Sequence, residues 1–375
     1  MPNGKSENSP GVARVSTLEL FFDLVFVFAI TQVSHLFAEA HGALDFLRAF
    51  LVLAVVWWMY GGYAWLTSNV STDRLLNRIL LLCGMAGFLV IALRIPTVAG
   101  HHGAIFGLAY LVVVLVHSAL FSHAPNSSAR AILGVLPFNL LLAAAVIVSG
   151  LVSDRWNWIP WVAAGAAMIA ATALHREREF QLSPSHFVER HGLVVLIALG
   201  ESVVATGAGA AELPVGFWLV AWALLGLALA AAIWWSYFDG DDARAEHAMT
   251  RATGADRARL AVYAYYHAHL LMIAGIVIAA AGVHEAVAHL EEPAEAAGWL
   301  MSSGVSLYLV GGAAYRRLLD IGPAWVRLAS AGLALGVALT GGVAGSLLQL
   351  TLVVALLVVM LVVERLVPMH TSPVT

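Results

Sequence analysis

Long apolar runs of membrane-spanning length dominate the chain. A helix that crosses a bilayer needs about 20 mostly apolar residues, and about twelve segments meet that length. Turn residues or charges separate most of them, but the last two are joined by little more than Thr340, Gly341 and Gly342 and could form one broken helix. The pattern predicts an all-α, polytopic membrane helix bundle. The expected spans are residues 17–39, 45–67, 77–96, 102–122, 130–150, 157–175, 186–208, 214–238, 259–284, 296–318, 322–341 and 343–366.

Composition supports a lipid environment. Of the 375 residues, 61% are hydrophobic and 11% are charged, whereas a soluble domain has about 25% charged residues. The net charge of −4 gives no reason to expect a nucleic-acid partner. Cys83 is the single cysteine, so neither an internal disulfide nor a cysteine-based metal site can form. Membrane lipid is the expected partner, and no metal or cofactor is expected. The oligomeric state stays open.

The two ends of the chain are expected to be tails. Residues 1–16 are polar and lack the apolar core and cleavage site of a secretory signal, which predicts a disordered cytoplasmic tail. Residues 367–375 are expected to form a cytoplasmic C-terminal tail. The first apolar run already carries Glu19 and Asp23, so we expect it to remain in the protein as the first membrane helix.

Basic residues indicate the orientation. With twelve spans, both termini and the even-numbered loops share one side of the membrane. That side carries 16 of the 19 Lys and Arg residues, and the other carries only Arg48, Arg94 and Arg155. Because basic loops stay in the cytoplasm, both termini are expected to be cytoplasmic, in a multi-pass protein of the cytoplasmic (inner) membrane. The polar segment 239–259 is expected to form a cytoplasmic helical connector.

An aromatic motif suggests that the chain contains two similar halves. Two Trp-Trp pairs occur, and each is followed two residues later by a tyrosine, at a spacing of 177 residues. Glu19 and Glu189 open the first and seventh spans 170 residues apart, a register that places Thr31 opposite Glu201. The aromatic motif, a candidate gate or repeat element, consists of Trp57, Trp58, Tyr60, Trp234, Trp235 and Tyr237.

The motif predicts a parallel repeat, with six helices in each half. The first half would cover residues 17–175 and the second 186–366, joined by a cytoplasmic linker at 176–185. Parallel repeats are related by an axis along the membrane normal. The alternative is that both Trp-Trp pairs belong to the interfacial aromatic belt and match by accident.

Ionisable groups in the first span are candidate functional residues, because charges at membrane depth are costly. Glu19 and Asp23 are four residues apart and therefore share a helix face near the cytoplasmic end. Gln32 returns to about the same face. Glu19 could instead be an N-terminal charge that the helix dipole favours.

The seventh span carries the deepest acid. Glu189 and Arg190 lie at its cytoplasmic end, and Glu201 lies 12 residues further along, about 18 Å on a helix. Nothing nearby in the sequence neutralises Glu201, and His267, His269 and Arg94 are left open as its partners. Glu189 and Arg190 could instead form a fixed structural pair, and His267 could be an ordinary polar helix contact.

The runs ELFFDLVFVFAITQVSHL and ERHGLVVLIALGES, followed by WWSYFD, resemble the bacterial low temperature requirement protein A family. The resemblance covers nearly the whole chain. It implies an integral membrane protein needed for growth in the cold, but implies no substrate or reaction. The family pattern matches at Glu19, Phe21, Phe22, Asp23, His186, Glu189, Arg190, Gly192, Gly200, Glu201 and Ser202.

Three functions fit these residues. The first is a transporter-like secondary carrier for an unknown small molecule, coupled to a proton or small ion. In it, Glu19, Asp23, Glu189 and Arg190 would form a cytoplasmic gate, and Glu201 with Gln32 and His267 the deeper coupling site. The second is a non-transporting structural or sensory protein that supports growth in the cold. The third is a lipid-acting membrane enzyme, which the lack of a phosphate-binding motif disfavours, so no catalytic residue is assigned.

Overall fold

A computed structural model describes residues 15–68, 70, 74–98, 103–122, 126–152, 155–174, 182–210, 214–288 and 295–367. Every regular element in these residues is helical, as expected. The predicted tails lie almost entirely outside the described residues; of the predicted linker 176–185, residues 182–185 are described, and α7 already begins at Pro184. The elements are α1 (Thr17–Ala38), α2 (Ala43–Thr67), α3 (Leu75–Arg94), η1 (Ile95–Thr97), α4 (Gly103–Phe121), α5 (Asn126–Ser149), α6 (Trp158–Leu174), α7 (Pro184–Gly209), α8 (Phe217–Phe238), α9 (Asp241–Arg251), α10 (Gly254–Leu260), η2 (Ala261–Ala268), α11 (His269–Ala288), α12 (Glu295–Leu319), α13 (Ala324–Ala338) and α14 (Gly341–Leu366).

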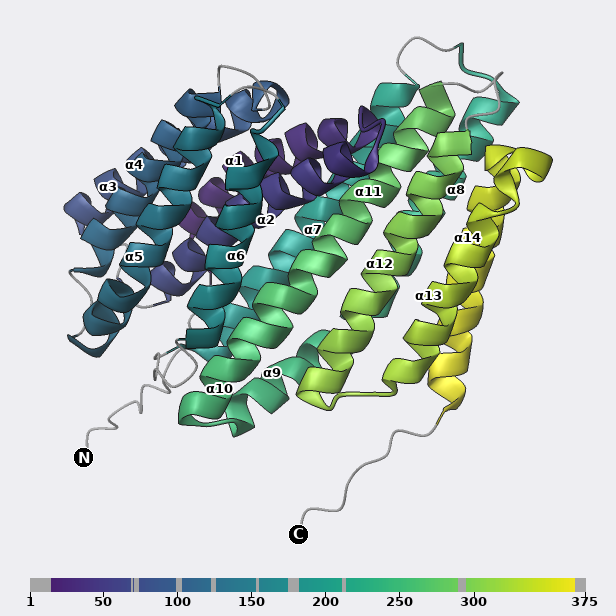
Figure 1. The fold of residues 1–375 in the computed structure, drawn as a ribbon. Helices are drawn as coiled ribbons and strands as arrows, with labels where there is room; N and C mark the ends of the chain where they lie inside the picture. Colours follow the sequence, from purple (N-terminus) through teal and green to yellow (C-terminus); the bar gives the residue numbers. More distant parts are fainter. Residues whose placement is uncertain are drawn as a thin grey trace, which may run out of the picture.

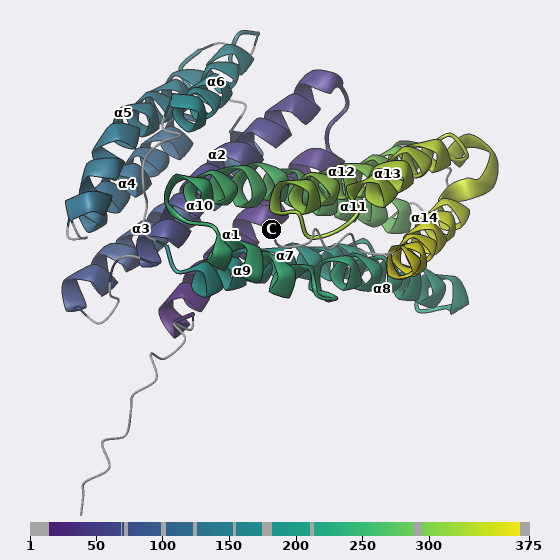
Figure 2. The same cartoon turned by 90° about the horizontal axis from the view of Figure 1, so that it is seen from below.

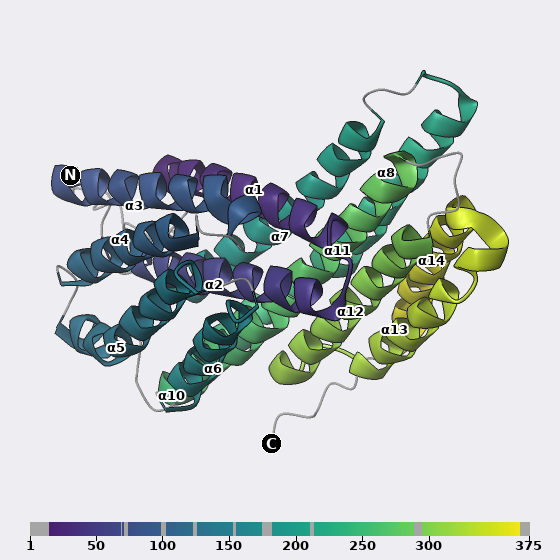
Figure 3. The ribbon, with the colours of Figure 1, turned by 45° about the horizontal axis from the view of Figure 1, so that its top comes forward.

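The helices form two groups that meet along α1, α7 and α11. Figure 1 shows α3, α4 and α5 on one side of the molecule and α12, α13 and α14 on the other, with α7 and α11 between them. Seen from below, the α4–α6 group and the α13–α14 group again lie at opposite ends (Figure 2). Helix α1 packs on both α7 and α11, and Figure 3 shows it where the two groups meet.

Helices cover all of the predicted spans, but they differ in how well they suit a bilayer. In the described part of the chain, eight helical segments are long and apolar enough to cross a membrane. Three other apolar helices are shorter, at Gly134–Ser149, Trp158–Ala173 and Ala324–Ala338. The count of twelve therefore stays a prediction. The eight are Thr17–Ala38, Ala43–Thr67, Leu75–Thr97, Gly103–Phe121, Pro184–Gly209, Phe217–Arg251, Gly254–Ala288 and Gly345–Leu366.

The outer surface of the bundle is apolar. Large side chains such as Leu24, Leu115 and Leu224 are more than half exposed along the helices. A soluble protein rarely leaves such broad apolar patches uncovered, whereas lipid tails would cover them. The exposed leucines therefore agree with the composition in placing this bundle in a membrane.

Glycines allow the closest helix contacts. A Cβ atom on Gly275 of α11 would overlap the backbone of Tyr308 on α12, and one on Gly304 of α12 would overlap the backbone of Ala279. Small residues are what membrane helices use to bring their backbones together. The α11–α12 pair is thereby fixed as the centre of the second half.

The structure answers whether the last two spans are separate helices and whether the polar connector is helical. Helices α13 and α14 are separate, because Leu339 and Thr340 form a turn between them, and α14 is kinked at Gly345, where φ is 74°. The polar segment 239–259 is helical, as expected, and forms α9 and most of α10.

Candidate functional site

Glu19 serves two roles at the start of α1. Its carboxylate accepts a hydrogen bond from the backbone N–H of Ser16 (2.7 Å), and the Ser16 hydroxyl accepts one from the N–H of Glu19 (3.3 Å). This reciprocal capping box fixes where α1 begins. The same carboxylate also contacts α7, since His186 Nε2 lies 3.1 Å from Oε1 of Glu19. Glu19 is therefore both a helix cap and a link between the two predicted halves.

The centre of the site is a buried ion pair one turn further along α1. Arg190 Nη2 on α7 lies 2.9 Å from Oδ1 of Asp23. The Tyr60 hydroxyl of α2 donates to the same Asp23 oxygen (2.9 Å), and the guanidinium carbon of Arg190 lies 5.7 Å from the Tyr60 ring centroid. Arg190 is 0% exposed and Asp23 is 2% exposed. Three helices thus converge on a single oxygen.

This ion pair is incompletely hydrogen-bonded. Among the described residues, Arg190 Nε, Arg190 Nη1 and Asp23 Oδ2 have no hydrogen-bond partner. Buried polar groups are normally paired, and leaving one unpaired costs about 1–3 kcal/mol, more when it is charged. A salt bridge with a purely structural role would be expected to use both carboxylate oxygens and most of the guanidinium donors.

Glu201, the acid deepest in α7, directly contacts α1. The Thr31 hydroxyl on α1 lies 2.6 Å from Oε2 of Glu201 on α7 and donates to it. The two residues face a cavity of about 30 Å³ that His35 and His284 also line. Thr31 and Glu201 are the pair that the 170-residue register places at equivalent positions.

The other predicted site residues lie elsewhere. Glu189 is exposed, so it does not pair with Arg190, whose partner is Asp23. Gln32 is half-buried and is not among the residues that line the Glu201 cavity. His267 lies in η2, where its Nδ1 donates to the carbonyl of Val262 (3.1 Å).

Neither histidine proposed as a partner of Glu201 contacts it in the structure. The ring of His267 packs on Tyr263 and Tyr266. His269 instead hydrogen-bonds the Tyr237 hydroxyl (2.9 Å). The sequence left the choice open among His267, His269 and Arg94, whereas the fold supplies Thr31, with His35 and His284 beside it.

The two aromatic motifs differ in position. Trp57 and Tyr60 are buried in the interior of α2, well before this helix ends at Thr67. Trp234 and Trp235 are 42% and 46% exposed near the end of α8, and only Tyr237 of that motif is buried. The first motif lies within the candidate site, whereas the tryptophans of the second face outward.

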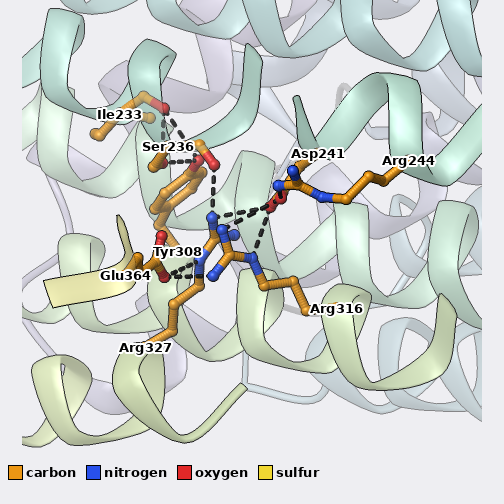
Figure 4. A network of polar contacts seen from close by, with 8 residues as sticks. All are labelled: Ile233, Ser236, Asp241, Arg244, Tyr308, Arg316, Arg327 and Glu364. Atoms are coloured by element: carbon orange, nitrogen blue, oxygen red, sulfur yellow. Dashed lines mark hydrogen bonds and ion pairs between the residues drawn. The ribbon is translucent and has the colours of Figure 1, made fainter. Parts of the chain in front are cut away.

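A second charged cluster lies in the second half and was not predicted as a unit. Asp241 at the start of α9 accepts from Arg316 Nε of α12 (2.8 Å) and from Arg327 Nη2 of α13 (2.9 Å). Glu364 of α14 lies 2.6 Å from Arg316 and 3.0 Å from Arg327. Figure 4 shows these side chains converging, with Arg244 on the outer side of Asp241.

This cluster ties five helices together, α8, α9, α12, α13 and α14. Arg327 also donates to the carbonyl of Ser236 on α8 (2.6 Å), and the Tyr308 hydroxyl lies 2.7 Å from the Ser236 hydroxyl. Directly bonded members of the cluster are up to 91 residues apart in sequence. The only sequence signal was a set of charges at the ends of apolar runs, and that signal does not indicate which charges meet.

The described residues contain no group of three or more His, Cys, Asp or Glu side chains arranged to hold a metal ion. The candidate site itself offers carboxylate, guanidinium, imidazole and phenol groups. These can bind and release a proton or a small ion, and can exchange hydrogen bonds when helices move.

Apolar helices with an apolar outer surface and internal ion pairs define a multi-pass integral membrane protein. The chain belongs to the family of bacterial low temperature requirement A proteins, whose family model matches residues 14–363. It is also similar to an uncharacterized protein of Rhizobium meliloti (strain 1021), with 25% identity over 293 residues that cover 74% of this chain and 70% of that protein. No solved structure matches the chain significantly.

Proposed function

We propose that this protein is a secondary carrier of the bacterial inner membrane, with a proton or small ion as the coupling species. The observation that carries the proposal is the buried Asp23–Arg190 pair, which joins α1 to α7 and leaves donors on Arg190 and an oxygen on Asp23 without partners. A charge pair with unused hydrogen-bonding capacity can accept an alternative partner, such as a proton, an ion or water, in a second conformation.

The order of helix contacts supports the proposed parallel repeat. In the first half α1 packs on α2 and α3, α2 packs on α6, and α3 to α6 pack in succession. In the second half α7 packs on α8 and α11, α8 packs on α14, and α11 to α14 pack in succession. Helices α9 and α10 and η2 are then an insertion in the second half. Carriers place coupling groups at the interface between repeats, where Asp23, Arg190 and Glu201 lie.

Within this proposal the two levels of the site have different tasks. Glu19, Asp23, His186 and Arg190 close the predicted cytoplasmic end, where α1 and α7 are joined by two ion contacts. Glu201 is the deeper coupling group, because it is buried beside a small cavity and bonded to the opposite half through Thr31. Transport requires the α1–α7 contacts to break and re-form as the halves move.

Charge movement after a pH jump tests the coupling role. Purified protein is reconstituted into liposomes, adsorbed on a solid-supported membrane and exposed to a step in pH. Wild-type protein should give a transient current above that of empty liposomes, and Glu201→Gln should remove most of it because the amide cannot take up a proton. Glu189→Gln, a change at an exposed neighbouring acid, should leave the current intact. Equal currents from Glu201→Gln and Glu189→Gln would contradict the coupling role of Glu201.

The second candidate is a non-transporting structural protein, and the charged cluster around Asp241 favours it. There each acid meets two or more arginines, as expected of a fixed network. Exchanging the charges of one pair separates the two functions. If Asp23 and Arg190 are structural, the double variant Asp23→Arg and Arg190→Asp should keep stability and growth in the cold. A carrier should keep at most the stability.

A further inference from the structure

A cavity larger than the one at Glu201 lies between the two halves. It measures about 150 Å³ and is bounded by α2, α4, α5 and α6 on one side and by α7, α10 and η2 on the other. Its walls are mainly aromatic and aliphatic, with the rings of Trp58, Trp65, Phe121 and Tyr266 among them. Arg259 also lines it, but this side chain is largely exposed and pairs with Asp256 (3.3 Å). The interior therefore favours a neutral, apolar occupant.

Two polar groups at this cavity lack partners. His117 lines the cavity and is 2% exposed; its ring lies against the backbone of Gly62 on α2, but neither ring nitrogen has full hydrogen-bond geometry with a residue that the structure describes. The Tyr266 hydroxyl, buried on the opposite half, is also unpartnered in that part of the chain. Since native proteins leave few buried polar groups unpaired, a bound molecule with one hydroxyl would satisfy an imidazole nitrogen or a phenol that the protein leaves free.

The wall formed by the second half has an unusual backbone. Residues Ala261–Ala268 form a π-helix, a rare conformation that occurs frequently at functional sites. In this segment the carbonyl of Tyr266 accepts a hydrogen bond from Trp57 Nε1 of α2 (3.0 Å). The π-helix thus joins the two halves through its backbone while presenting Tyr266 to the cavity.

The cavity is connected to the ion pair through the first aromatic motif. Trp58 lines the cavity, and the neighbouring Trp57 stacks on Tyr60 with ring centroids 5.5 Å apart. Tyr60 in turn donates to Asp23 (2.9 Å). A molecule that displaces Trp58 or Tyr266 would therefore change the contacts of the Asp23–Arg190 pair.

We propose that this cavity binds a neutral single-ring aromatic molecule that carries a hydroxyl group, that is, a phenol. An apolar protein cavity of about 150 Å³ accommodates benzene, so the volume of this cavity suits a single ring. The aromatic walls stack on the ring, and His117 or Tyr266 exchanges a hydrogen bond with the hydroxyl. That such a phenol is the transported substrate rests on the proposed function, whereas the binding itself does not.

Ligand binding is measured by fluorine NMR on the purified full chain in detergent, with a fluorinated phenol and the matching fluorinated toluene as probes. The phenol should bind more tightly than the toluene. His117→Phe and Tyr266→Phe remove hydrogen-bonding capacity while keeping a ring. A neutral hydrogen bond contributes about 1 kcal/mol, or about fivefold in affinity. At least one of these variants should lower phenol affinity by that factor and leave toluene affinity unchanged.

Ala171→Leu is the control that separates binding in the cavity from partition of the probe into detergent. Ala171 is a small residue in the cavity wall, so a leucine there fills the cavity. This variant should abolish binding of both probes while thermal unfolding remains cooperative. Equal affinity for phenol and toluene, or phenol binding that persists in Ala171→Leu, would overturn the proposal. The binding experiment measures no transport. A missing pH-jump current would therefore contradict the proposed carrier function only, and missing phenol binding would contradict the proposed binding site only.

Discussion

Arg190 is fully buried where α1, α2 and α7 meet, and it draws most of its partners from segments far away in the sequence. The sequence placed its charge at a helix end and left open whether Arg190 joins a gate with Glu19, Asp23 and Glu189 or pairs only with Glu189. Adjacent residues in a helix point about 100° apart, so Glu189 faces outward when Arg190 faces the interior. The pairing with Asp23 and Tyr60 depends on how α1 and α2 pack on α7, which local patterns do not determine.

Replacing Arg190 with methionine should destabilise the protein strongly. The change leaves the Asp23 carboxylate buried without its cation, and breaking a buried pair in this way costs about 3–5 kcal/mol. Adding Asp23→Asn should recover part of that loss, because the uncompensated charge is removed as well. The free energy of unfolding is measured in detergent by denaturant titration.

The matched control for that experiment is Arg259→Met. Arg259 and Asp256 form an exposed pair, with side-chain exposures of 62% and 71%, and exposed pairs contribute about 0–1 kcal/mol. Similar losses in Arg190→Met and Arg259→Met would mean that burial of the Asp23–Arg190 pair has no energetic consequence. The fixed-pair and mobile-pair interpretations both require the larger loss at Arg190.

At the scale of the elements, the length of the apolar runs predicts where the helices lie, but the sequence gives no sign of an irregular helix backbone. Helices begin and end near the predicted limits because Ser16 caps α1 and Pro184 starts α7, signals that are local in sequence. The π-helix at Ala261–Ala268 has no comparable signal. The segment packs on α12 and accepts a hydrogen bond from Trp57 of α2, and the apolar pattern alone predicts an ordinary helix there.

Gly275→Ala should weaken the α11–α12 contact. The added methyl group would overlap the backbone of Tyr308, which cannot move like the end of a flexible side chain. Overpacking of this kind costs about 1–3 kcal/mol. The melting temperature in detergent should therefore fall relative to wild type.

Gly332→Ala in α13 is the control, because nothing lies within 4 Å of its added Cβ. In an unobstructed helix alanine is better than glycine by about 1 kcal/mol, so this variant should be unchanged or slightly more stable. A pair of variants with equal melting temperatures would contradict the close approach of α11 and α12.

At the scale of the whole molecule, the sequence predicts an all-helical membrane bundle but does not predict which residues meet in the candidate site. Thr31 donates a hydrogen bond to Glu201, and the parallel repeat that would make these two residues equivalent stays a prediction. The cluster of Asp241, Arg316 and Arg327 could not be assembled from the sequence. Its charges lie on helices whose neighbours are set by the packing of the complete bundle.

Site-directed labelling tests the complete topology. In a Cys83→Ser background, Arg155→Cys precedes α6 and Glu246→Cys lies on α9; both positions are exposed. The charge bias places Arg155 outside and Glu246 in the cytoplasm. A membrane-impermeant maleimide added to intact cells should therefore label Arg155→Cys at once, and Glu246→Cys only after permeabilisation.

The interval between these two positions contains α6, α7 and α8, of which α6 is the shortest. Its 17 residues span about 26 Å at 1.5 Å per residue, slightly less than the roughly 30 Å hydrocarbon core. Labelling of both positions from the same side would mean that one of the three helices, and α6 first of all, does not cross the membrane. The six-helix halves would then be unequal, and the parallel repeat that brings Asp23 and Glu201 to one interface would lose its basis.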